Sequence, residues 1–499
     1  MPRCRCFIAR SHNGLRREVL KGGGKGEMNV GQEEMVRSLR EMVGEDYVNT
    51  DVFERINYAD TSLPYDVEEE DLPDVVVHPG NAHEVAEVVK YANREKIPVT
   101  TYGSGTSLIF GTKPKHRGIT LSTKRLNFFQ IEEDFQWFEC GAGVTIAHIT
   151  GELEKRGYCL PINVGSRLQA TIGGAVSVNT CGHLMDYIYG KPVSNVLSVE
   201  IVLPTGEIIQ TGSKSIRRAT GWDLMRLFVG AEGILGVITR IRMAFYPKPE
   251  TVDTVAFFKT AEEIGHAFAL MFKKKLPPIL DGEFVSEKCC KVGYEAYGLD
   301  FPEGAMAVTQ SMGRTKEDAL NNAKQVADFL RRAGAIESFV LEDAKIRGQV
   351  WGVRENAMRW GKEKGLKGYL AIEVNPPLPF LPRAIRELNH ITEGRNDLIG
   401  GTEAYLYGHI GASSLHCLFA FPYAWSREKM KQVVRDIWNL EKDLNIKYDG
   451  VGGDWGQLPY RVPFYREKYG ETSYGIIKKV KQLLDPNNIL NRGNLEGEE

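Results

Sequence analysis

The sequence lacks several patterns that would assign a chemistry at once. None of its eight cysteines forms a CxxC pair, which argues against a cysteine-ligated iron–sulfur cluster or a disulfide framework and fits a reducing compartment. No apolar run approaches the roughly 20 residues that span a bilayer. The formal net charge is only −2 at pH 7, so nothing suggests a nucleic-acid partner. These absences predict a cytoplasmic globular protein.

A chain of 499 residues is too long for one ordinary core and predicts two or three domains. Residues 1–27 are Arg-rich and almost free of acidic residues, which suits a transit peptide or a stretch that is not native. We favour the second reading, because "KGGGKGE" at residues 21–27 is what a purine-rich ribosome-binding site gives when translated. Met28 is then the expected start, which the intact mass of the natively expressed protein would test.

From Pro73 onward the pattern becomes regular, with a short apolar run, a turn and then a helix. Asn81 is the expected N-cap, with Glu84 completing a capping box. Pro98 separates this helix from a strand over 99–102, which runs into "GSGTSLIFG". Clustered N–H groups in such a turn can converge on a phosphate, although an ordinary tight turn is the alternative. The apolar face of the helix is Val85, Val88, Val89 and Ala92.

Neither common nucleotide fingerprint is present. Gly103 and Gly105 begin a GxGxxG pattern, but Leu108 occupies its third glycine position, and no GxxxxGK[ST] occurs anywhere. Two further Gly-rich stretches follow, "SRLQATIGGAVSVNTCG" and "GWDLMRLFVGAEGILGVITRIRM", the second of which feeds a strand over 236–242. An amphipathic helix marked by Ile146 and Leu153 and a hairpin around Pro204 complete the region. Three Gly-rich approaches in one α+β domain predict an extended dinucleotide in a groove.

Four segments then carry a family resemblance. In order, "PVTTYGSGTS", "TIGGAVSVNTCG", "VEIVLPTGE" and "LFVGAEGILGVIT" resemble the FAD-binding domain of the vanillyl-alcohol oxidase / p-cresol methylhydroxylase superfamily of FAD-linked oxidoreductases. Within it they resemble most the glycolate oxidase and D-lactate dehydrogenase flavoprotein branch. The resemblance runs from about Asp71 to the closing "LLDPNNILNRGN" and implies FAD as cofactor. The residues it implies along FAD are Gly103, Ser104, Gly105, Thr106, Ser107, Thr171, Gly173, Gly174, Gly182, Val237, Ile238 and Asn491.

The resemblance also implies a fold, an α+β flavoprotein of two domains with a PCMH-type FAD-binding domain and a cap domain over the flavin ring. We expect the FAD-binding domain at 28–248, the cap or substrate domain at 249–440, and a C-terminal segment at 441–499 that packs back on the FAD-binding domain. Residues 1–27 are expected to be an extension that is not native or is disordered.

The hydroxy-acid branch of the family carries a WxxRE pattern, which this chain has at Trp351 to Glu355. The resemblance makes Arg354 a carboxylate anchor, and a planar guanidinium can bind a carboxylate through two parallel hydrogen bonds. The alternative role for Arg354 is a salt bridge to a helix neighbour.

A second family pattern is altered in "GHIGASSLHC", where His409 and His416 stand seven residues apart. The histidines keep the family spacing, while the family Asp-Gly-Asn between them is replaced and the later Glu-His-Gly becomes Asp454-Trp455-Gly456. His409, His416 and Asp454 could together hold Zn²⁺ or a similar divalent ion. Otherwise the two histidines punctuate a buried strand or serve directly as a base.

Trp455 replaces the family histidine that acts as general base, and an indole cannot accept the proton. Tyr460 and Arg461 resemble the Tyr-Arg segment that holds a substrate phenolate in p-cresol methylhydroxylase, although a surface Tyr-Arg pair is the alternative. Leu108 stands where the phenol-oxidising branch carries a tyrosine, which counts against a complete phenolate clamp.

The leading function is FAD-dependent dehydrogenation of a 2-hydroxy acid or related small alcohol by hydride transfer to flavin. Arg354 would bind the carboxylate, the histidine-aspartate metal would lower the hydroxyl pKa, and Tyr460 or one histidine would replace the missing base. The second enzyme reading is oxidation or hydroxylation of a para-substituted phenol on Tyr460 and Arg461. A reading of another class makes the chain a non-catalytic or electron-relay flavin subunit of a complex.

The expected partners are a small-molecule substrate and an electron acceptor that the sequence does not identify. An electron-transfer flavoprotein, a cytochrome, a quinone, oxygen or an iron–sulfur subunit would each serve. A cytoplasmic location is expected, with attachment to a membrane through a partner left open.

Overall fold

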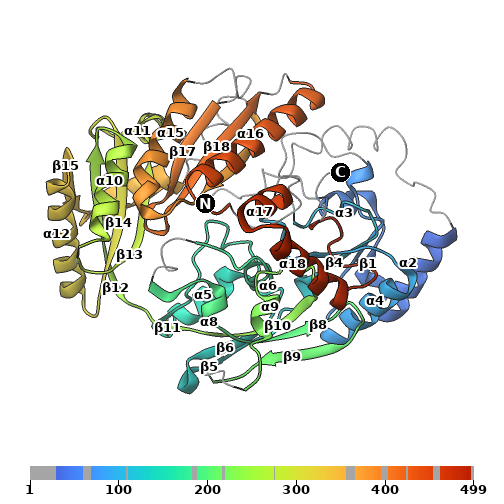
Figure 1. Ribbon diagram of the computed structural model, residues 1–499. Coiled ribbons are helices and arrows are strands. Elements are labelled where there is room, and N and C mark those ends of the chain that lie inside the picture. The colour runs from blue at the N-terminus through green and yellow to red at the C-terminus, as the bar shows by residue number, and fades with distance from the viewer. Residues whose placement is uncertain are drawn as a thin grey trace.

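The structure is a computed structural model, shown in Figure 1. It describes residues 30–59, 69–107, 111–182, 188–215, 220–274, 276–355, 366–394, 403–422, 425–452 and 461–495. Among the residues singled out above, Met28, Leu108, Asp454, Trp455, Gly456 and Tyr460 lie outside these ranges, as do residues 1–27. Within these ranges, no helix is long and apolar enough to cross a bilayer.

The first unit is a four-stranded sheet in the order β1-β2-β4-β3, in which β2, β4 and β3 run parallel. The predicted helix is confirmed as α4, which buries all four predicted apolar residues, and the predicted strand is confirmed as β3. The Asn81 side chain accepts the Glu84 N–H as expected, but Glu84 reaches back to the Gly80 N–H, one residue before the cap. The elements of this unit are α2 (Val30–Val43), η1 (Glu45–Tyr47), β1 (Val48–Asn49), α3 (Val52–Ile56), η2 (Glu69–Asp71), β2 (Val75–Val77), α4 (Ala82–Glu95), β3 (Val99–Tyr102), β4 (Ile119–Ser122) and η3 (Thr123–Arg125).

The second unit is a five-stranded antiparallel sheet in the order β5-β6-β10-β8-β9. The predicted hairpin is confirmed as β8 and β9, and α5 buries Ile146 and Leu153 as its spacing required. The strand expected over 236–242 is β10, which begins one residue later and ends two residues later. The elements are β5 (Phe129–Glu132), η4 (Glu133–Phe135), β6 (Trp137–Gly141), α5 (Ile146–Glu154), β7 (Tyr158–Cys159), α6 (Ile172–Ser177), α8 (Pro192–Asn195), β8 (Val196–Val202), β9 (Ile208–Gly212), α9 (Met225–Phe228), β10 (Val237–Ala244) and β11 (Tyr246–Pro247).

The cap is a seven-stranded antiparallel sheet in the order β15-β12-β14-β13-β17-β18-β16, at the upper left of Figure 1. Side chains on one face pack with α10, α12, α15 and α16, and those on the other pack with α11 and α13. The elements are β12 (Glu250–Phe258), α10 (Ala261–Met271), β13 (Ile279–Val285), α11 (Glu287–Tyr297), β14 (Ala305–Gly313), α12 (Lys316–Arg332), β15 (Glu337–Val340), α13 (Ala344–Glu355), β16 (Leu366–Val374), η5 (Leu378–Phe380), α15 (Leu381–Gly394), β17 (Glu403–His409), η6 (Ile410–Ala412), β18 (Ser414–Pro422) and α16 (Arg427–Lys447).

The C-terminal segment returns to the first unit through α17 (Arg461–Tyr469) and α18 (Glu471–Leu484). These helices lie between the cap and the sheets of the first and second units (Figure 1). Lys481 is buried and donates to the carbonyls of Ile234 and Leu490 and to the Asp485 carboxylate. Asp485 in turn accepts the N–H groups of Ile489 and Leu490. Leu490 then bridges to β3 in parallel, so the closing segment extends the first sheet.

Candidate active site

The first two Gly-rich segments lie against each other. The first follows β3 directly, and a Cβ added to Gly103 would lie 2.5 Å from Thr171 Oγ1. Thr171 caps α6, where its Oγ1 accepts the Gly174 N–H. Gly105 has φ +64°, and a Cβ there would lie 2.0 Å from the Tyr102 hydroxyl oxygen. Both the backbone conformation and the steric contact therefore disfavour a side chain at this position. The contact at Gly103 therefore requires the absence of a side chain.

The third Gly-rich segment is held to the first by Asn491. Its Oδ1 accepts the Thr101 N–H at 2.9 Å and its Nδ2 donates to the Glu232 carbonyl at 2.6 Å. Asn491 is only 4% exposed. Its side chain is thus occupied in joining the end of β3 to the turn before β10.

Two other glycines predicted along the cofactor sit against neighbouring backbone. A Cβ on Gly173 would lie 2.7 Å from the Ala142 carbonyl oxygen, and one on Gly182 would lie 2.2 Å from that of Asn163. Val237 and Ile238 are buried in apolar clusters, so it is their backbone that they can offer to a ligand.

These segments fit a dinucleotide. Three Gly-rich turns converge, and the absence of a Cβ at their glycines lets their backbones approach one another closely. Thr101 Oγ1 and Ser122 Oγ, near the carboxyl ends of β3 and β4, are buried without a hydrogen-bond partner in the described part of the chain. Buried hydroxyls are normally satisfied, so polar groups of a ligand are expected there.

On the cap, the stretch "GHIGASSLHC" is a hairpin. β17 ends at His409, η6 and Ser413 (φ +53°) reverse the chain, and β18 carries His416. His416 pairs with Tyr407, two residues before His409, so both imidazoles lie on one sheet face, with ring centroids 4.9 Å apart. The two histidines therefore lie on neighbouring strands and not on a single one, because the turn cancels the odd spacing.

A buried carboxylate connects the histidines to the WxxRE helix. Glu283 of β13 is fully buried, its Oε1 lies 2.5 Å from His409 Nδ1, and its Oε2 accepts Arg354 Nε at 2.6 Å. The Arg354 guanidinium also lies over the Tyr407 ring, 4.7 Å from its centroid. Burial acts to lower the pKa of Arg354, but Glu283 and Tyr407 raise it above the ordinary value, so it stays charged.

Arg354 is therefore in a salt bridge, but to a strand of the sheet and not to a helix neighbour. The hydrogen bond uses Nε, which leaves the terminal guanidinium nitrogens as the edge that could receive a carboxylate. One turn earlier on α13, Trp351 Nε1 donates to Asp253 at 2.7 Å, and Arg347 Nε donates to the same oxygen at 2.6 Å. The WxxRE pattern thus holds α13 to the face of the cap sheet that carries Asp253 and Glu283.

His416 is held neutral by its surroundings. Burial lowers its pKa to about 4, opposed by Glu373 and assisted by His409 and Arg354. Its Nδ1 lies 3.7 Å from Glu373 Oε1 on β16. A neutral imidazole at pH 7 can accept a proton or ligate a metal.

The expected metal trio is not assembled by the described residues. Asp454 lies outside them, and no group of three His, Cys, Asp or Glu side chains placed to hold a metal occurs within them. The converging Gly-rich segments fit FAD, and the described residues give no support for zinc.

Arg461 lies in the interior. It is 5% exposed, and its Nη2 donates at 2.9 Å to Glu441 on α16, which is itself 1% exposed. The surface-pair alternative is therefore wrong for Arg461, while Tyr460 lies outside the described residues. The guanidinium charge is already compensated by a carboxylate of the protein.

Sequence reasoning missed Glu283, although a signal existed. The strand over 279–285 reads "ILDGEFV", with acidic residues at alternate positions in an otherwise apolar run. Acidic side chains on a buried strand are rare unless they are paired, so Asp281 and Glu283 could have been marked as members of a polar site.

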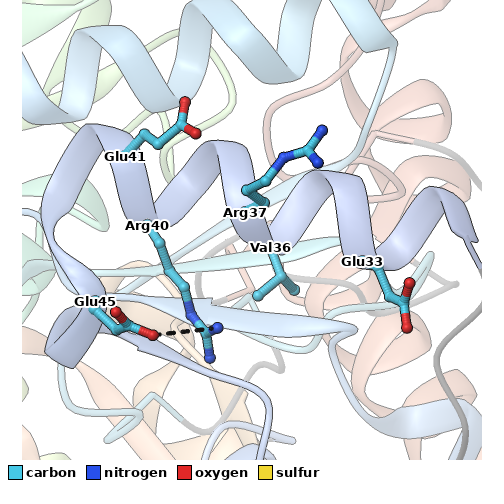
Figure 2. Close-up of a pocket in the computed structure, with 6 residues that line it drawn as sticks. All are labelled: Glu33, Val36, Arg37, Arg40, Glu41 and Glu45. Carbon is cyan, nitrogen blue, oxygen red and sulfur yellow. Dashed lines mark ion pairs between the residues drawn. The ribbon is translucent and has the colours of Figure 1, made fainter.

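A pocket elsewhere lies along α2 of the first unit (Figure 2). Its lining is Glu33, Val36, Arg37, Arg40, Glu41 and Glu45. Arg40 pairs with Glu45 at 3.5 Å, and both side chains are exposed. The pocket is on the far side of the first unit from the cap sheet in Figure 1, and it adds nothing to the site.

Comparison with known proteins matches both halves. Residues 73–212 match the FAD binding domain family, and residues 248–495 match the family of FAD linked oxidases, C-terminal domain. The chain is 27% identical over 422 residues to a D-lactate dehydrogenase of Archaeoglobus fulgidus, covering 84% of this chain and 90% of that protein. It is 25% identical over 432 residues to glycolate oxidase subunit GlcD of Bacillus subtilis, covering 85% and 89%.

Among solved structures, p-cresol methylhydroxylase with substrate bound superposes with a TM-score of 0.75 at 16% identity, covering 94% of this chain and 98% of that one. That likeness confirms the two-domain α+β fold. The chain belongs to the family of FAD-linked oxidoreductases with a PCMH-type FAD-binding domain and an FAD-linked oxidase C-terminal domain, as its motifs indicated.

Proposed function

We propose that the protein is an FAD-dependent dehydrogenase of a small 2-hydroxy acid. The observation that carries the proposal is the Glu283 carboxylate, which holds Arg354 and His409 side by side on the cap face. A cation next to an imidazole is the pair that oxidation of a 2-hydroxy acid needs, one for the carboxylate and one for the hydroxyl proton. The names of the relatives, D-lactate dehydrogenase and glycolate oxidase subunit, support the same substrate class.

Each residue has a distinct role in this proposal. The terminal nitrogens of Arg354 bind the substrate carboxylate and fix the position of the α-carbon. His409, whose Nδ1 faces Glu283, takes the hydroxyl proton on Nε2 as the α-hydrogen leaves with its electron pair. FAD, when bound, supplies the two-electron acceptor for that hydride. The product is the 2-oxo acid.

The phenol reading has weaker support. A phenolate would need a terminal nitrogen of Arg461, and one of these, Nη2, already donates to Glu441 inside the protein, whereas Arg354 is bonded to Glu283 through Nε. The fold shared with p-cresol methylhydroxylase does not carry substrate choice, because one fold hosts several chemistries.

The test is anaerobic flavin absorbance of the purified holoprotein during separate additions of D-lactate, L-lactate, glycolate and 4-cresol. We expect bleaching by one or more of the 2-hydroxy acids and none by 4-cresol. Bleaching by 4-cresol alone would overturn the proposal in favour of phenol oxidation, and bleaching by none of a wider panel would favour a relay subunit. Repeating the assay after chelator treatment tests the metal reading, which predicts lost bleaching that Zn²⁺ restores.

A further inference from the structure

We propose that Tyr407 is a positioning residue, whose aromatic ring holds the Arg354 guanidinium in the orientation that binds the substrate carboxylate. This inference rests on the proposed function, because it takes from it the role of Arg354 as the carboxylate anchor. It adds a residue that no motif of the sequence singled out. Tyr407 acts through Arg354, and the inference assigns it no part in proton transfer.

The Tyr407 ring is the surface against which Arg354 lies. Tyr407 belongs to β17 and is 5% exposed, and the central guanidinium carbon of Arg354 lies over its ring, 4.7 Å from the ring centroid. Arg354 reaches it from α13 and is itself 7% exposed. A cation over an aromatic face is attracted by the negative charge of that face, and more strongly where water is excluded. The ring therefore limits the positions that the guanidinium can take.

Two contacts of different kinds define the orientation of the guanidinium. Glu283 Oε2 accepts Arg354 Nε at 2.6 Å, which fixes one edge of the group, and Tyr407 supports its face. A single hydrogen bond leaves a planar group free to turn about that bond, so the face contact is needed to direct the terminal nitrogens. Among the residues that the structure describes, neither terminal nitrogen of Arg354 has a hydrogen-bond partner. This edge of the guanidinium is the one that a substrate carboxylate would use.

Tyr407 also contacts His416, and the two contacts have different consequences. The two residues pair in register across β17 and β18, with ring centroids 5.5 Å apart. A change at Tyr407 that acts through Arg354 weakens the binding of a small carboxylate, whether or not that carboxylate reacts. A change that acts through His416 lowers the rate of flavin reduction at saturating substrate. Carboxylate affinity and limiting rate therefore distinguish the two contacts.

Tyr405 is a matched control on the same strand. It lies two residues before Tyr407, so the two side chains are on the same face of the sheet. It is fully buried in the same apolar cluster, and a cation lies over its ring too, because Lys288 Nζ is 4.9 Å from the ring centroid. A leucine at either position removes a tyrosine ring from this cluster, but only the ring of Tyr407 lies under the carboxylate anchor.

The experiment compares Tyr407→Leu, Tyr407→Phe and Tyr405→Leu in the full-length holoprotein. Isothermal titration calorimetry with oxalate gives the affinity for a carboxylate without turnover. Anaerobic stopped-flow reduction by whichever of D-lactate, L-lactate and glycolate reduces the wild type gives an apparent Kd and a limiting rate. Thermal unfolding gives the stability of each variant.

A leucine has no π face, so it fills part of the volume of the ring without attracting the guanidinium. We expect Tyr407→Leu to weaken oxalate binding by about 10-fold, the order that a desolvated cation–π contact contributes to affinity. The apparent Kd for the 2-hydroxy acid should rise by a similar factor, and the limiting rate should change less. Tyr407→Phe keeps the aromatic face and should bind oxalate nearly as the wild type does. Tyr405→Leu should lower the melting temperature and leave oxalate binding unchanged.

Three results would overturn the proposal. The first is wild-type oxalate affinity in Tyr407→Leu. The second is an equal loss of affinity in Tyr407→Leu and Tyr405→Leu, since packing of the cluster would then be the cause. The third is an equal loss in Tyr407→Phe and Tyr407→Leu, because the hydroxyl group and not the ring would then matter. A loss confined to the limiting rate belongs with the first result and assigns the effect to His416.

If Tyr407→Leu does not fold, pentafluorophenylalanine incorporated at position 407 decides. It has nearly the size of phenylalanine but reverses the charge of the ring face, so it must bind oxalate more weakly than Tyr407→Phe does. Equal affinity of these two proteins would contradict the role of the ring. A wild type that binds oxalate but that none of the three acids reduces is a failure of the proposed function, and the oxalate titrations still decide the role of Tyr407. A wild type that does not bind oxalate would refute both.

Discussion

Replacing Asn491 tests whether the C-terminal segment assembles the cofactor groove. Asn491→Ala removes both side-chain hydrogen bonds that join the Thr101 N–H to the Glu232 carbonyl. Asn491 and Glu232 are 4% and 6% exposed, so water does not replace the lost partner. An unsatisfied buried group costs about 1–3 kcal/mol, which gives roughly 2–6 kcal/mol for the two groups.

The backbone adds a second contribution. Asn491 has φ +42°, a region that Asn tolerates and that costs other residues with a Cβ about 1–2 kcal/mol. Asn491→Gly relieves this strain but still removes both bonds, so the difference between the two variants isolates the backbone contribution. Asn487→Ala is the control, because its side chain bonds Asn93 at the exposed surface of the same segment.

Urea unfolding of the apoprotein gives the stability change, and the quenching of FAD fluorescence gives the cofactor Kd. We expect Asn491→Ala to be destabilised by several kcal/mol and to bind FAD about 10-fold or more weakly, since 1.4 kcal/mol is tenfold in affinity. Asn487→Ala should change neither quantity by more than about 0.5 kcal/mol. An Asn491→Ala protein that is destabilised yet binds FAD as the wild type does would refute this role of Asn491, because the FAD site would then form without its two side-chain hydrogen bonds.

Two further predictions follow from the FAD-binding part. Gly103→Ala should weaken FAD binding, measured by the same fluorescence titration, because its Cβ would lie 2.5 Å from Thr171 Oγ1 and must push the two Gly-rich segments apart; unchanged binding would mean that this contact is not part of the groove. Burial, Lys124 and Arg125 lower the pKa of His78 to about 4, so below its ordinary value of 6.5 the unfolded chain takes up a proton that the folded protein refuses. Stability should therefore fall as the pH drops from 6.5 toward 4, and His78→Gln should flatten this dependence in melting curves; an equally steep curve in the variant would exclude His78 as its source.

The sequence predicted the elements whose signals are local. The periodicity of Val85 to Ala92 and the break at Pro98 are sufficient for α4 and β3, because capping, helical spacing and proline geometry act within a few residues. The Gly-rich turns were also recognisable, because positions without room for a Cβ are occupied by glycine, which can be read from the sequence. Their order along the chain was enough to indicate the family and its cofactor.

The partners of the site were decided by tertiary structure. Glu283 is separated by 71 residues from Arg354 and by 126 residues from His409, and they meet because β13 pairs with β17 in one register and α13 crosses that face. The same holds for Arg461, which the sequence could place beside a phenolate but which the fold buries against Glu441. A shift of one residue in register would turn Glu283 to the opposite face. The sequence therefore determined which reactive side chains the protein contains, and the register of the strands determined which of these side chains are in contact.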